Sequence, residues 1–548
     1  MCGELRYGLR LSQFFTLNTA EKAGFINLNI NEFSIIEAEL KNVNEIKIPE
    51  AADPRIYSLE YDSRSVKQGS LFFALSGLHT DGSLYIKDAI KNGAVVIIHQ
   101  NDIKEKENDV VYIKVKDARF SMSAVSAAFY QFPSRRLRVT GVTGTEGKST
   151  TVYLIYQLLT LLGKKTGFIS TVQHCLGGEV LENSEHQTTP EAPVVHRFLK
   201  EMADNGCEYA VVESSSHGLS AKTNRLGDID FFCAVLTNVT HEHLEFHGTW
   251  EQYRYDKANL FRALDKYPAE KDSLKPFGVI NADDNSMMYF KKAANVKTLT
   301  YSYAGRDGDI ILEMTKSSLW GNWYSVFIPA LNEHINIRDT LPGAFNCANV
   351  LASLLAVSGL TGFSIKETAL FVKDLKPVRG RMTAVIKGQP FDVVVDYAHT
   401  PSSFKTVFPP LRDRKKAEGK RIISLFGSAG ERDTKKRPQQ GKIAAFYSDI
   451  IILTDEDPRG ENSMDILVQI EAGVTAENAG TVFKRDENLF LIPDRPKAIR
   501  KALSLAREGD MVILLGKGHE NSIIYADKVM PFDEITETER ALSEMGFI

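Results

Sequence analysis

The amino-acid sequence predicts an α/β protein with three domains, each built around a mainly parallel sheet. Three observations support this: the length of 548 residues, the alternation of short apolar runs with helical periodicity, and two breaks in that alternation. At roughly 150 residues per domain, one core is too few for this length. The apolar runs are typical of strands in βαβ units and lie at residues 94–98, 209–212, 232–236, 393–395, 422–426, 450–453 and 511–515.

The two breaks divide the chain. Residues 132–136 (FPSRR) and 376–380 (KPVRG) each interrupt the periodic pattern with a proline, so both are interpreted as linkers. They predict domains at 1–135, 136–378 and 379–548.

Composition and charge narrow the class of protein. With 66 basic and 70 acidic residues the formal charge is -4, which gives no reason to expect nucleic acid or an anionic membrane surface as a partner. The five cysteines form no CxxC pair, which argues against a disulfide framework or a thiolate metal site. No apolar run approaches the roughly 18 residues of a membrane span, and the N-terminal segment lacks the features of a secretory signal. We therefore expect a cytoplasmic protein and, by default, a monomer.

A glycine-rich loop is the most specific functional signal. The segment GVTGTEGKST at 141–150 lies between a predicted strand at 137–140 and a predicted helix at 151–162. In that context backbone N–H groups point at an anion, a lysine reaches the β- and γ-phosphates of a nucleotide, and a hydroxyl can ligate Mg²⁺. Val142 stands where the strict pattern GxxxxGK[ST] needs glycine, so the loop is a variant. A turn needed only for packing would leave the lysine and hydroxyl unexplained. We predict an ATP site formed by Gly144, Thr145, Gly147, Lys148, Ser149 and Thr150.

Two polar segments follow predicted strands and so belong to the same edge of the sheet as the loop. Glu213 begins ESSSHG, and His243 lies in TNVTHEHLEFHGT. A carboxylate, an imidazole and the Ser149 hydroxyl can together hold Mg²⁺ against phosphates, although imidazole is an unusual ligand for that ion. Helix capping by residues 214–216 and ordinary loop histidines at 217, 241 and 247 explain the segments equally well.

Lys257 falls in an apolar helical stripe. In TWEQYRYDKANLFRAL it shares a face with Trp250, Tyr253, Leu260 and Leu264, at spacings of three and four residues. Such a lysine extends its amine to solvent, pairs with an acid, or changes its charge. After reaction with CO₂ it would carry an anionic carbamate able to bind a second metal ion. The segment alone does not decide between these outcomes.

Taken in order along the chain, these and further motifs resemble those of the Mur ligases. The matching segments span roughly residues 58–540 and are GVTGTEGKSTT, TTPE, ESSSH, TNVTHEH, DKANLF, NADD, LPGAFN, GRM, DYAHTP and GERDTKKRP. The N-terminal segment DSRSVKQGSLFFA at 62–74, followed by Asp81-Gly82, is similar to the branch that makes UDP-N-acetylmuramoyl-tripeptides. Each motif alone is modest, but their conjunction is specific.

The resemblance implies an ATP-dependent ligase with a UDP-binding N-terminal domain, a central P-loop ATPase-type parallel sheet and a Rossmann-like C-terminal domain. In this family ATP converts a substrate carboxylate to an acyl phosphate, which an amino group attacks to form an amide. Positioning and charge neutralisation supply most of the catalysis. For this chain the acceptor implied is UDP-N-acetylmuramoyl-L-alanyl-D-glutamate, which places the enzyme in peptidoglycan precursor synthesis and thereby in cell-wall construction, cell shape and division.

The resemblance also implies roles for individual residues. Catalytic positions match Lys148, His217 and a carbamylated Lys257. Ligands of two Mg²⁺ ions match Ser149, Glu213, His243 and Lys257. Further ATP contacts match Asn281 and Asp396, and contacts to the UDP-sugar peptide match Ser63, Thr188, Thr189, Ser216 and Arg225. Arg381 and His399 match motif positions without a defined role. Glu146 departs from the usual loop TGTNGKT and has no explanation.

Three C-terminal loops predict the other half of the site. LFGSAGERD, LTDEDPRGE and LLGKGHE each follow a predicted strand, and in a parallel sheet the three loops share one edge. The resemblance assigns the incoming amino acid to Asp457, Arg459, Gly516 and Glu520. Arg459 can bind a carboxylate with two parallel hydrogen bonds, and Glu520 can hold a distal ammonium. Without the resemblance, a Pro-Gly turn and a glycine-rich strand exit explain two of these loops.

The identity of the amino acid stays open. Diaminopimelate-adding members usually carry DNPR, whereas Asp457 stands here in place of the asparagine and suits a purely cationic tail. Arg459 favours a substrate carboxylate. The sequence therefore predicts a diamino acid: meso-diaminopimelate, L-lysine or ornithine.

Two other functions compete with this one. A folylpolyglutamate-synthetase-like ligase would share the architecture but would not need the DSR and DG pattern. A non-catalytic P-loop nucleotide switch would leave Glu213, Lys257 and Arg459 dispensable.

Overall fold

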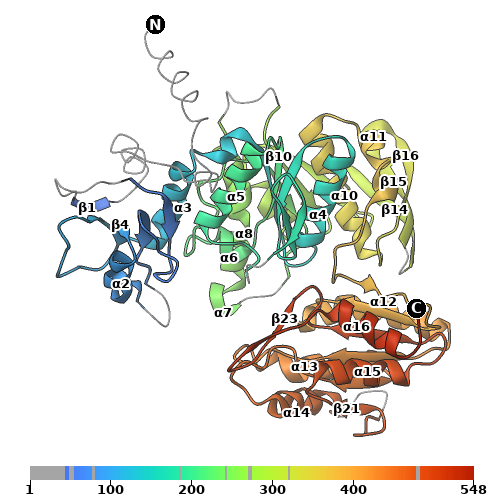
Figure 1. Ribbon diagram of the computed structural model, residues 1–548. Helices are drawn as coiled ribbons and strands as arrows, with labels where there is room; N and C mark the ends of the chain where they lie inside the picture. The colour runs from blue at the N-terminus through green and yellow to red at the C-terminus, as the bar shows by residue number, and fades with distance from the viewer. Residues whose placement is uncertain are drawn as a thin grey trace.

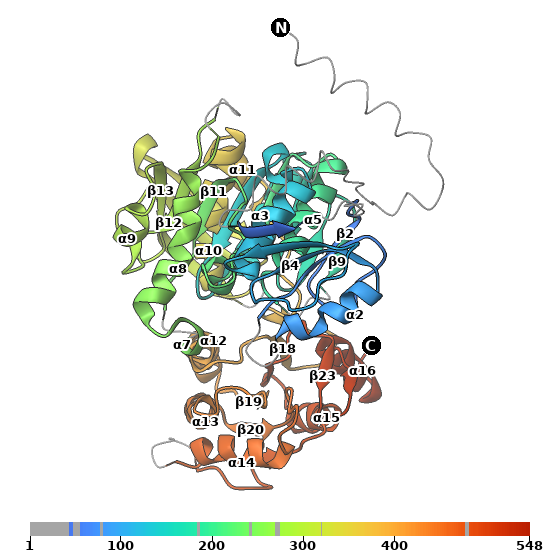
Figure 2. The same cartoon turned by 90° about the vertical axis from the view of Figure 1, so that its left-hand side faces the viewer.

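Three main sheets follow one another along the chain (Figure 1). The computed structural model describes residues 43–47, 55–76, 81–183, 187–240, 244–268, 274–318, 321–476 and 482–548. The first sheet lies beside the central one in Figure 1, and the third lies below both in Figure 2. The predicted α/β class with mainly parallel sheets is confirmed. Within the described ranges, no helix has both the length and the apolar character that a membrane crossing requires.

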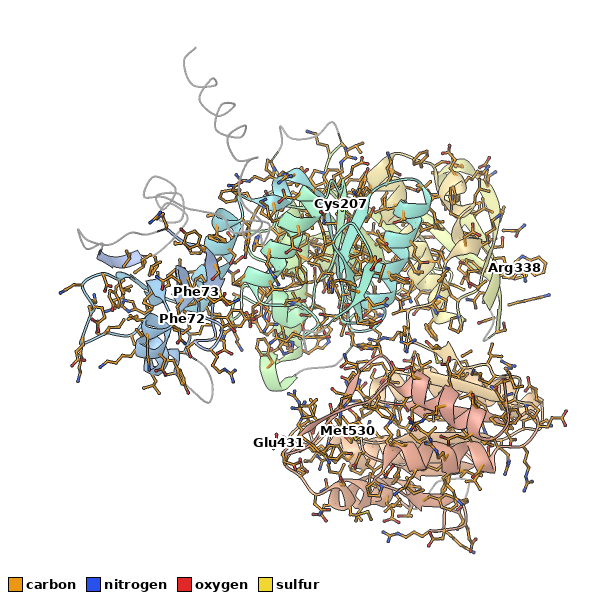
Figure 3. The ribbon with its side chains drawn as sticks, viewed as in Figure 1. Phe72, Phe73, Cys207, Arg338, Glu431 and Met530 are labelled. Atoms are coloured by element: carbon orange, nitrogen blue, oxygen red, sulfur yellow. The ribbon has the colours of Figure 1, made fainter. Side chains whose placement is uncertain are left out.

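The first sheet has five strands in the order β1, β5, β4, β3, β2, all parallel except β1. Neighbouring side chains on β3 point to opposite faces: Phe73 packs with α3, and Phe72 packs with α2 (Figure 3). The elements are β1 (Val43–Lys47), β2 (Ser58–Glu60), β3 (Ser70–Phe73), α2 (Ile86–Lys91), β4 (Ala94–His99), β5 (Val111–Val115) and α3 (Ala118–Phe129).

The central sheet has eleven strands, and its middle part is parallel as predicted. The parallel strands are ordered β14, β13, β12, β11, β6, β10, β7, and antiparallel strands extend both edges. The antiparallel extension from β14 to β16 was not predicted, because one of its faces is solvated and its apolar content is low. The bounds are β6 (Arg138–Thr143), β7 (Thr166–Ile169), β8 (Gln173–Cys175), β9 (Val180–Glu182), β10 (Tyr209–Glu213), β11 (Phe231–Leu236), β12 (Phe277–Asn281), β13 (Lys297–Ser302), β14 (Ile310–Ser318), β15 (Gly321–Ile328) and β16 (Glu333–Asp339).

Four long helices cover the two faces of the central sheet. The helices α4 (Lys148–Leu161) and α10 (Phe345–Thr361) pack on one face, and α5 (Ala192–Asp204) and α8 (Trp250–Leu264) on the other (Figure 1). The helix α4 begins three residues before the predicted start at 151. The lysine and serine of the glycine-rich loop therefore belong to its first turn.

The C-terminal sheet has six strands in the order β17, β18, β22, β19, β20, β21, all parallel except β17. Because β22, β19 and β20 are neighbours, the three loops that follow them share one edge, as predicted. The helices α12, α13 and α14 pack on one face, and α15 and α16 on the other. The bounds are β17 (Thr383–Ala384), β18 (Asp392–Asp396), α12 (Pro401–Ala417), β19 (Ile422–Phe426), α13 (Lys436–Tyr447), β20 (Ile450–Leu453), α14 (Ser463–Val474), β21 (Leu489–Leu491), α15 (Arg495–Leu505), β22 (Met511–Leu515) and α16 (Glu534–Glu544).

Candidate active site

Two glycines shape the loop between β6 and α4. At Gly144 φ is +154°, and a Cβ there would lie 1.8 Å from Oγ1 of Thr237. At Gly147 φ is +84°, and a Cβ would lie 2.6 Å from Oδ1 of Asn349. Neither position tolerates a side chain. The loop therefore brings its backbone, and then the unpaired N–H groups of the first turn of α4, to the carboxyl end of β6, as a phosphate-binding loop requires.

The segment after β11 holds this loop in shape. The N–H of Glu146 donates to Oδ1 of Asn238 at 2.9 Å. The carbonyl of Glu146 accepts from Oγ1 of Thr237 at 2.6 Å and from Nδ2 of Asn238 at 3.1 Å. These three contacts use the main chain of residue 146, so they can form with any side chain at that position. Thr237 and Asn238 lie in the motif TNVTHEH, but the sequence analysis gave them no role.

Ser149 and Glu213 meet beside the loop. Oγ of Ser149 donates to Oε1 of Glu213 at 2.9 Å, and Oε2 accepts the N–H of Thr171 at 2.8 Å. Both side chains are buried. Hydroxyl and carboxylate oxygens are the ligands that Mg²⁺ prefers, so this pair fits the predicted metal site. The third predicted ligand, His243, lies outside the described residues.

Lys257 does not extend its amine to solvent. Its side chain is 1% exposed, its Nζ donates to the carbonyl of Gly144 at 2.6 Å, and the amine lies 4.4 Å from the ring centre of Tyr253. Lys148 binds the same loop, because its Nζ donates to the carbonyl of Thr145 at 2.7 Å. Both lysines that were predicted to be catalytic therefore reach the phosphate loop.

The residues matched to the UDP-sugar peptide are brought together in part. Oγ1 of Thr189 donates to the carbonyl of Glu213 at 2.8 Å, and Nη1 of Arg225 donates to the carbonyl of Thr189 at 2.8 Å. Thr188 is half-buried next to them. Ser63 belongs to the first sheet's domain, where its carbonyl accepts Nδ2 of Asn92 at 3.0 Å.

A buried chain of hydrogen bonds orients Ser216, the first residue of α6 (Ser216–Leu219). Its Oγ lies 3.1 Å from Nε2 of His247, and Nδ1 of His247 lies 2.7 Å from Oδ2 of Asp256. The carboxylate accepts, so Nδ1–H donates to it and Nε2 accepts from the serine. His247, at the end of α7 (Leu244–His247), is thus more than an ordinary loop histidine. The ring of His217 lies 5.4 Å from that of His247.

The side chains of the two residues matched to the nucleoside form hydrogen bonds with main-chain groups of other residues. Asn281, at the end of β12, donates from Nδ2 to the carbonyl of Thr237 at 2.7 Å and accepts the N–H of Asp283 at 2.9 Å. Asp396, at the end of β18, accepts the N–H groups of Met382 and Ala398, both at 2.7 Å. Burial raises the pKa of the Asp396 carboxyl.

The predicted amino-acid residues gather around a lysine that the sequence analysis missed. Nζ of Lys517 donates to Oδ1 of Asp457 at 2.8 Å and to Oε2 of Glu520 at 2.6 Å. Burial opposes the charged amine, but Glu520 and Asp457 outweigh it and raise the pKa of Lys517. A Cβ on Gly516 would lie 3.3 Å from Oε2 of Glu456. The glycine therefore leaves room for Glu456, the second residue here for which no role was predicted. Both missed residues stand inside the quoted segments LTDEDPRGE and LLGKGHE.

Arg459 lies beside this cluster with an unusual backbone. Its φ is +52°, its N–H donates to the carbonyl of Ile524 at 2.9 Å, and its buried Nε has no partner among the described residues. Behind it, Arg495 forms a buried ion pair with Glu534 at 2.8 Å. The same guanidinium donates to the carbonyls of Asp455 and Leu515, both at 2.8 Å, and so ties together the loops after β20 and β22.

Arg381 and His399 lie around one half-buried aromatic ring. The guanidinium of Arg381 is 4.6 Å from the ring centre of Tyr397, and the rings of His399 and His519 are each 4.7 Å from it. Burial, with Arg381, Lys517 and His399 nearby, lowers the pKa of His519 to about 3. The segments GRM, DYAHTP and GKGHE thus converge at one place.

Comparison with known proteins identifies the family. The Mur ligase family catalytic domain matches residues 55–137, the Mur ligase middle domain residues 142–357, and the Mur ligase glutamate ligase domain residues 380–518. A UDP-N-acetylmuramyl-tripeptide synthetase of Treponema denticola is 51% identical over 506 residues, which cover 89% of this chain and 94% of that protein. The chain belongs to the Mur ligase family.

Other Mur ligases and related folds are similar to the chain. A UDP-N-acetylmuramoyl-L-alanyl-D-glutamate--2,6-diaminopimelate ligase of Geobacillus kaustophilus is 37% identical, covering 90% of this chain and 96% of that protein. A solved structure of a ligase with that name has a TM-score of 0.61 at 28% identity and covers 95% of this chain and 100% of that one. A folylpolyglutamate synthase of Mycobacterium tuberculosis with ADP bound shares the fold alone, with a TM-score of 0.56 at 15% identity over 78% of this chain and 94% of that one.

Membership of the Mur ligases confirms three predictions: the family, the three-domain α/β fold, and an ATP-dependent ligase that makes peptidoglycan precursors from small-molecule substrates. It makes a non-catalytic nucleotide switch untenable. The roles of single residues, the metal ions, the carbamate and the oligomeric state stay predictions.

Proposed function

We propose that this Mur ligase joins a diamino acid to UDP-N-acetylmuramoyl-L-alanyl-D-glutamate through an acyl phosphate. The observation that carries the proposal is the position of Glu213. Its side chain binds Ser149 of the phosphate loop, and its main-chain carbonyl binds Thr189, which in turn is bound by Arg225. Glu213 therefore contacts both the residues expected to bind ATP and those expected to bind the acceptor. Phosphoryl transfer between two bound substrates requires that their binding sites lie next to each other in this way. The names of relatives such as the tripeptide synthetase of Treponema denticola support the same acceptor.

The residues of the chain divide the chemistry between them. The loop N–H groups and Lys148 bind the ATP phosphates, while Thr189, Ser216 and Arg225 hold the acceptor. An acceptor carboxylate oxygen attacks the γ-phosphorus, the bond to ADP breaks, and an acyl phosphate forms. The amine of the incoming amino acid then attacks the carbonyl carbon, phosphate leaves, and the amine loses a proton.

Metal ions would neutralise the charge that develops on the phosphates. Ser149 and Glu213 would hold one Mg²⁺, and His243 with a carbamate on Lys257 would hold a second. The buried oxygen donors beside the loop fit the first ion. The burial of Lys257 against the loop carbonyl supports the second role, because the modified amine would already stand next to the phosphates.

The charges of the amino-acid site favour lysine or ornithine over diaminopimelate. Glu456, Asp457 and Glu520 supply three carboxylates, whereas Lys517 and Arg459 supply two cations. Every amino acid brings one α-carboxylate, which Arg459 would bind. Lys517 is already paired with Asp457 and Glu520, so among these five residues no cation is left for the second carboxylate of diaminopimelate. Oε2 of Glu456 is buried without a partner among the described residues, and a distal ammonium would satisfy it.

Phosphate release tests the proposal. The enzyme is assayed with ATP, Mg²⁺ and UDP-N-acetylmuramoyl-L-alanyl-D-glutamate, and with L-lysine, L-ornithine, meso-diaminopimelate or L-norleucine, which is lysine without its ammonium. We expect kcat/KM for lysine or ornithine to exceed that for norleucine by about tenfold to a hundredfold, the effect of one charge-assisted hydrogen bond. Activity only with monoamino acids would refute the ligation of a diamino acid. A preference for diaminopimelate would refute the charge argument alone.

A further inference from the structure

A single carboxylate joins the first and middle domains at the edge of the acceptor site. Oε1 of Glu191 accepts from Nη1 of Arg119 at 3.1 Å and from Nη2 of Arg225 at 2.9 Å. Arg119 lies on α3 of the first domain, Glu191 directly precedes α5, and Arg225 lies in the loop before β11. The side chains are 28%, 8% and 12% exposed, so solvent screens these ion pairs only weakly. We call Arg119, Glu191 and Arg225 the junction cluster.

The helix α3 also holds the loop that carries Arg225. Nδ2 of Asn224 donates to the carbonyl of Phe120 at 2.9 Å, and the N–H of Asp228 donates to Oγ of Ser123 at 3.2 Å. Both acceptors lie on α3, which also packs against α5. The first domain therefore contacts the loop on both sides of Arg225, and its position sets where that arginine stands.

Two bonds fix the plane of the Arg225 guanidinium. Nη1 donates to the carbonyl of Thr189, and Nη2 donates to Glu191. Because the guanidinium is planar, these bonds also determine where its third nitrogen points. That nitrogen, Nε, is buried without a partner among the described residues, and so is Oε2 of Glu191. Buried polar groups are normally satisfied, so Nε of Arg225 has an unused N–H that an oxygen of a ligand could accept. The cluster carries two positive charges and one negative charge, which suits an anionic ligand.

We propose that Glu191 is a positioning residue for the acceptor, and that Arg119 acts through it. Glu191 holds the guanidinium of Arg225 in the orientation that binds anionic oxygens of the UDP-linked peptide. Arg119 couples that orientation to the first domain, where the UDP moiety is expected to bind. The inference rests on the proposed function, because it assumes that Arg225 contacts the acceptor.

Steady-state kinetics and direct binding test Glu191. The variant Glu191→Gln keeps the shape of the side chain and removes its charge. We expect the KM and the calorimetric Kd for UDP-N-acetylmuramoyl-L-alanyl-D-glutamate to rise by about tenfold to a hundredfold, the effect of one charge-assisted hydrogen bond. The KM values for ATP and for the amino acid should change less than about twofold, since neither ligand is bound by Arg225 in this scheme.

Variants of Arg119 test the coupling. Arg119→Met should raise the same KM less than Glu191→Gln does, and Arg119→Lys, which keeps the charge, should restore part of the loss. The double variant Arg119→Met/Glu191→Gln should be no worse than Glu191→Gln alone, because both changes interrupt one chain of contacts. The matched control is Arg135→Met, which removes a half-exposed arginine from an ion pair with Asp230 at the same junction and should leave KM unchanged.

The results of these experiments distinguish a failure of the inference about Glu191 from a failure of the proposed function. If the unaltered enzyme neither binds nor uses the acceptor, the proposed function fails and the inference fails with it. If the unaltered enzyme is active and Glu191→Gln changes only its melting temperature, or raises the KM of all three substrates equally, the junction cluster is merely structural and the inference is overturned. If Glu191→Gln does not fold, an unchanged acceptor KM in Arg119→Met overturns it.

Discussion

Replacing His196 should remove a pH dependence from the stability of the middle domain. His196 lies in α5 with its side chain fully buried, and neither ring nitrogen has a hydrogen-bond partner among the described residues. Burial lowers the pKa of this ring from 6.5 to about 3. In the unfolded chain the ring regains its ordinary pKa. Below pH 6.5 the unfolded state therefore binds a proton that the folded state excludes, and stability falls as the pH falls.

The size of the effect follows from the two pKa values. At pH 5.0 the unfolded ring lies about 1.5 pH units below its pKa, whereas the folded ring is still neutral. Each unit corresponds to 1.36 kcal/mol, so His196 lowers the free energy of unfolding by about 2 kcal/mol at pH 5.0 and by almost nothing at pH 7.5. The loss continues to grow until the pH approaches the folded pKa.

Hydrogen exchange of the α5 amides measures this free energy locally, which matters because a three-domain chain need not unfold in one step. The variant is His196→Leu, compared with the unaltered protein at pH 7.5 and at pH 5.0. The change in packing alters the free energy of unfolding equally at both pH values. The free energy of unfolding of the variant, relative to that of the unaltered protein, should therefore be about 2 kcal/mol higher at pH 5.0 than at pH 7.5. An advantage that is equal at both pH values would show that the buried ring is protonated in place, and would refute the reasoning.

Two further predictions concern the site itself. Lys257→Ala should lower kcat by at least about a hundredfold, because it removes a charge stabiliser next to the phosphates, and excess acetate or propionate should restore part of the activity; unchanged turnover in the phosphate assay would remove Lys257 from the metal site. His247→Gln and Ser216→Ala should each raise the KM for the acceptor by about tenfold. The double variant should raise it no further, because His247 acts only by orienting the Ser216 hydroxyl. Additive effects of the two changes would show that His247 does not act through Ser216.

The sequence predicted those parts of the site whose residues are contiguous. The loop from Gly144 to Thr150 could be recognised because the strand, the glycines, the lysine and the helix follow one another directly. Several strands of the parallel sheets, such as β4, β11 and β22, were predicted for a similar reason, since burial on both faces makes each a continuous apolar run. Both bounds of the loop were misplaced: β6 runs to Thr143 and not to residue 140, and α4 begins at Lys148 and not at residue 151. The helix start was missed because a lysine and a serine in a first turn have no apolar periodicity.

The contacts that orient the site residues could not be predicted, because their partners are far apart in sequence. Glu191 and Arg119 are separated by 72 positions, and His247 and Ser216 by 31. Glu191, Ser216 and His247 belong to quoted segments and Arg119 to none, and no spacing rule connects either pair. A sequence pattern can thus indicate which side chains contact a substrate. It is less able to indicate which other side chains hold those side chains in place.

Asp457 shows how the structure changes an argument from sequence. From the sequence, an extra acid beside the substrate was expected to suit a purely cationic tail. In the structure, Oδ1 of Asp457 instead accepts from Lys517 and from the N–H of Ile524. In the proposed function, Asp457 therefore acts with Glu520 to cancel the charge of Lys517, which would otherwise be available to the second carboxylate of diaminopimelate. Glu456 is left for an ammonium.

Three variants separate these two explanations of Asp457. If Lys517 is the discriminating charge, Asp457→Asn should raise kcat/KM for meso-diaminopimelate relative to L-lysine by about tenfold, the effect of one charged contact. The double variant Asp457→Asn/Lys517→Met should lose that gain. If Asp457 instead binds the tail itself, Lys517→Met alone should free the acid and lower the KM for lysine. A gain for diaminopimelate that survives the loss of Lys517 would contradict this account, because it would show that Lys517 is not the cation that binds the second carboxylate.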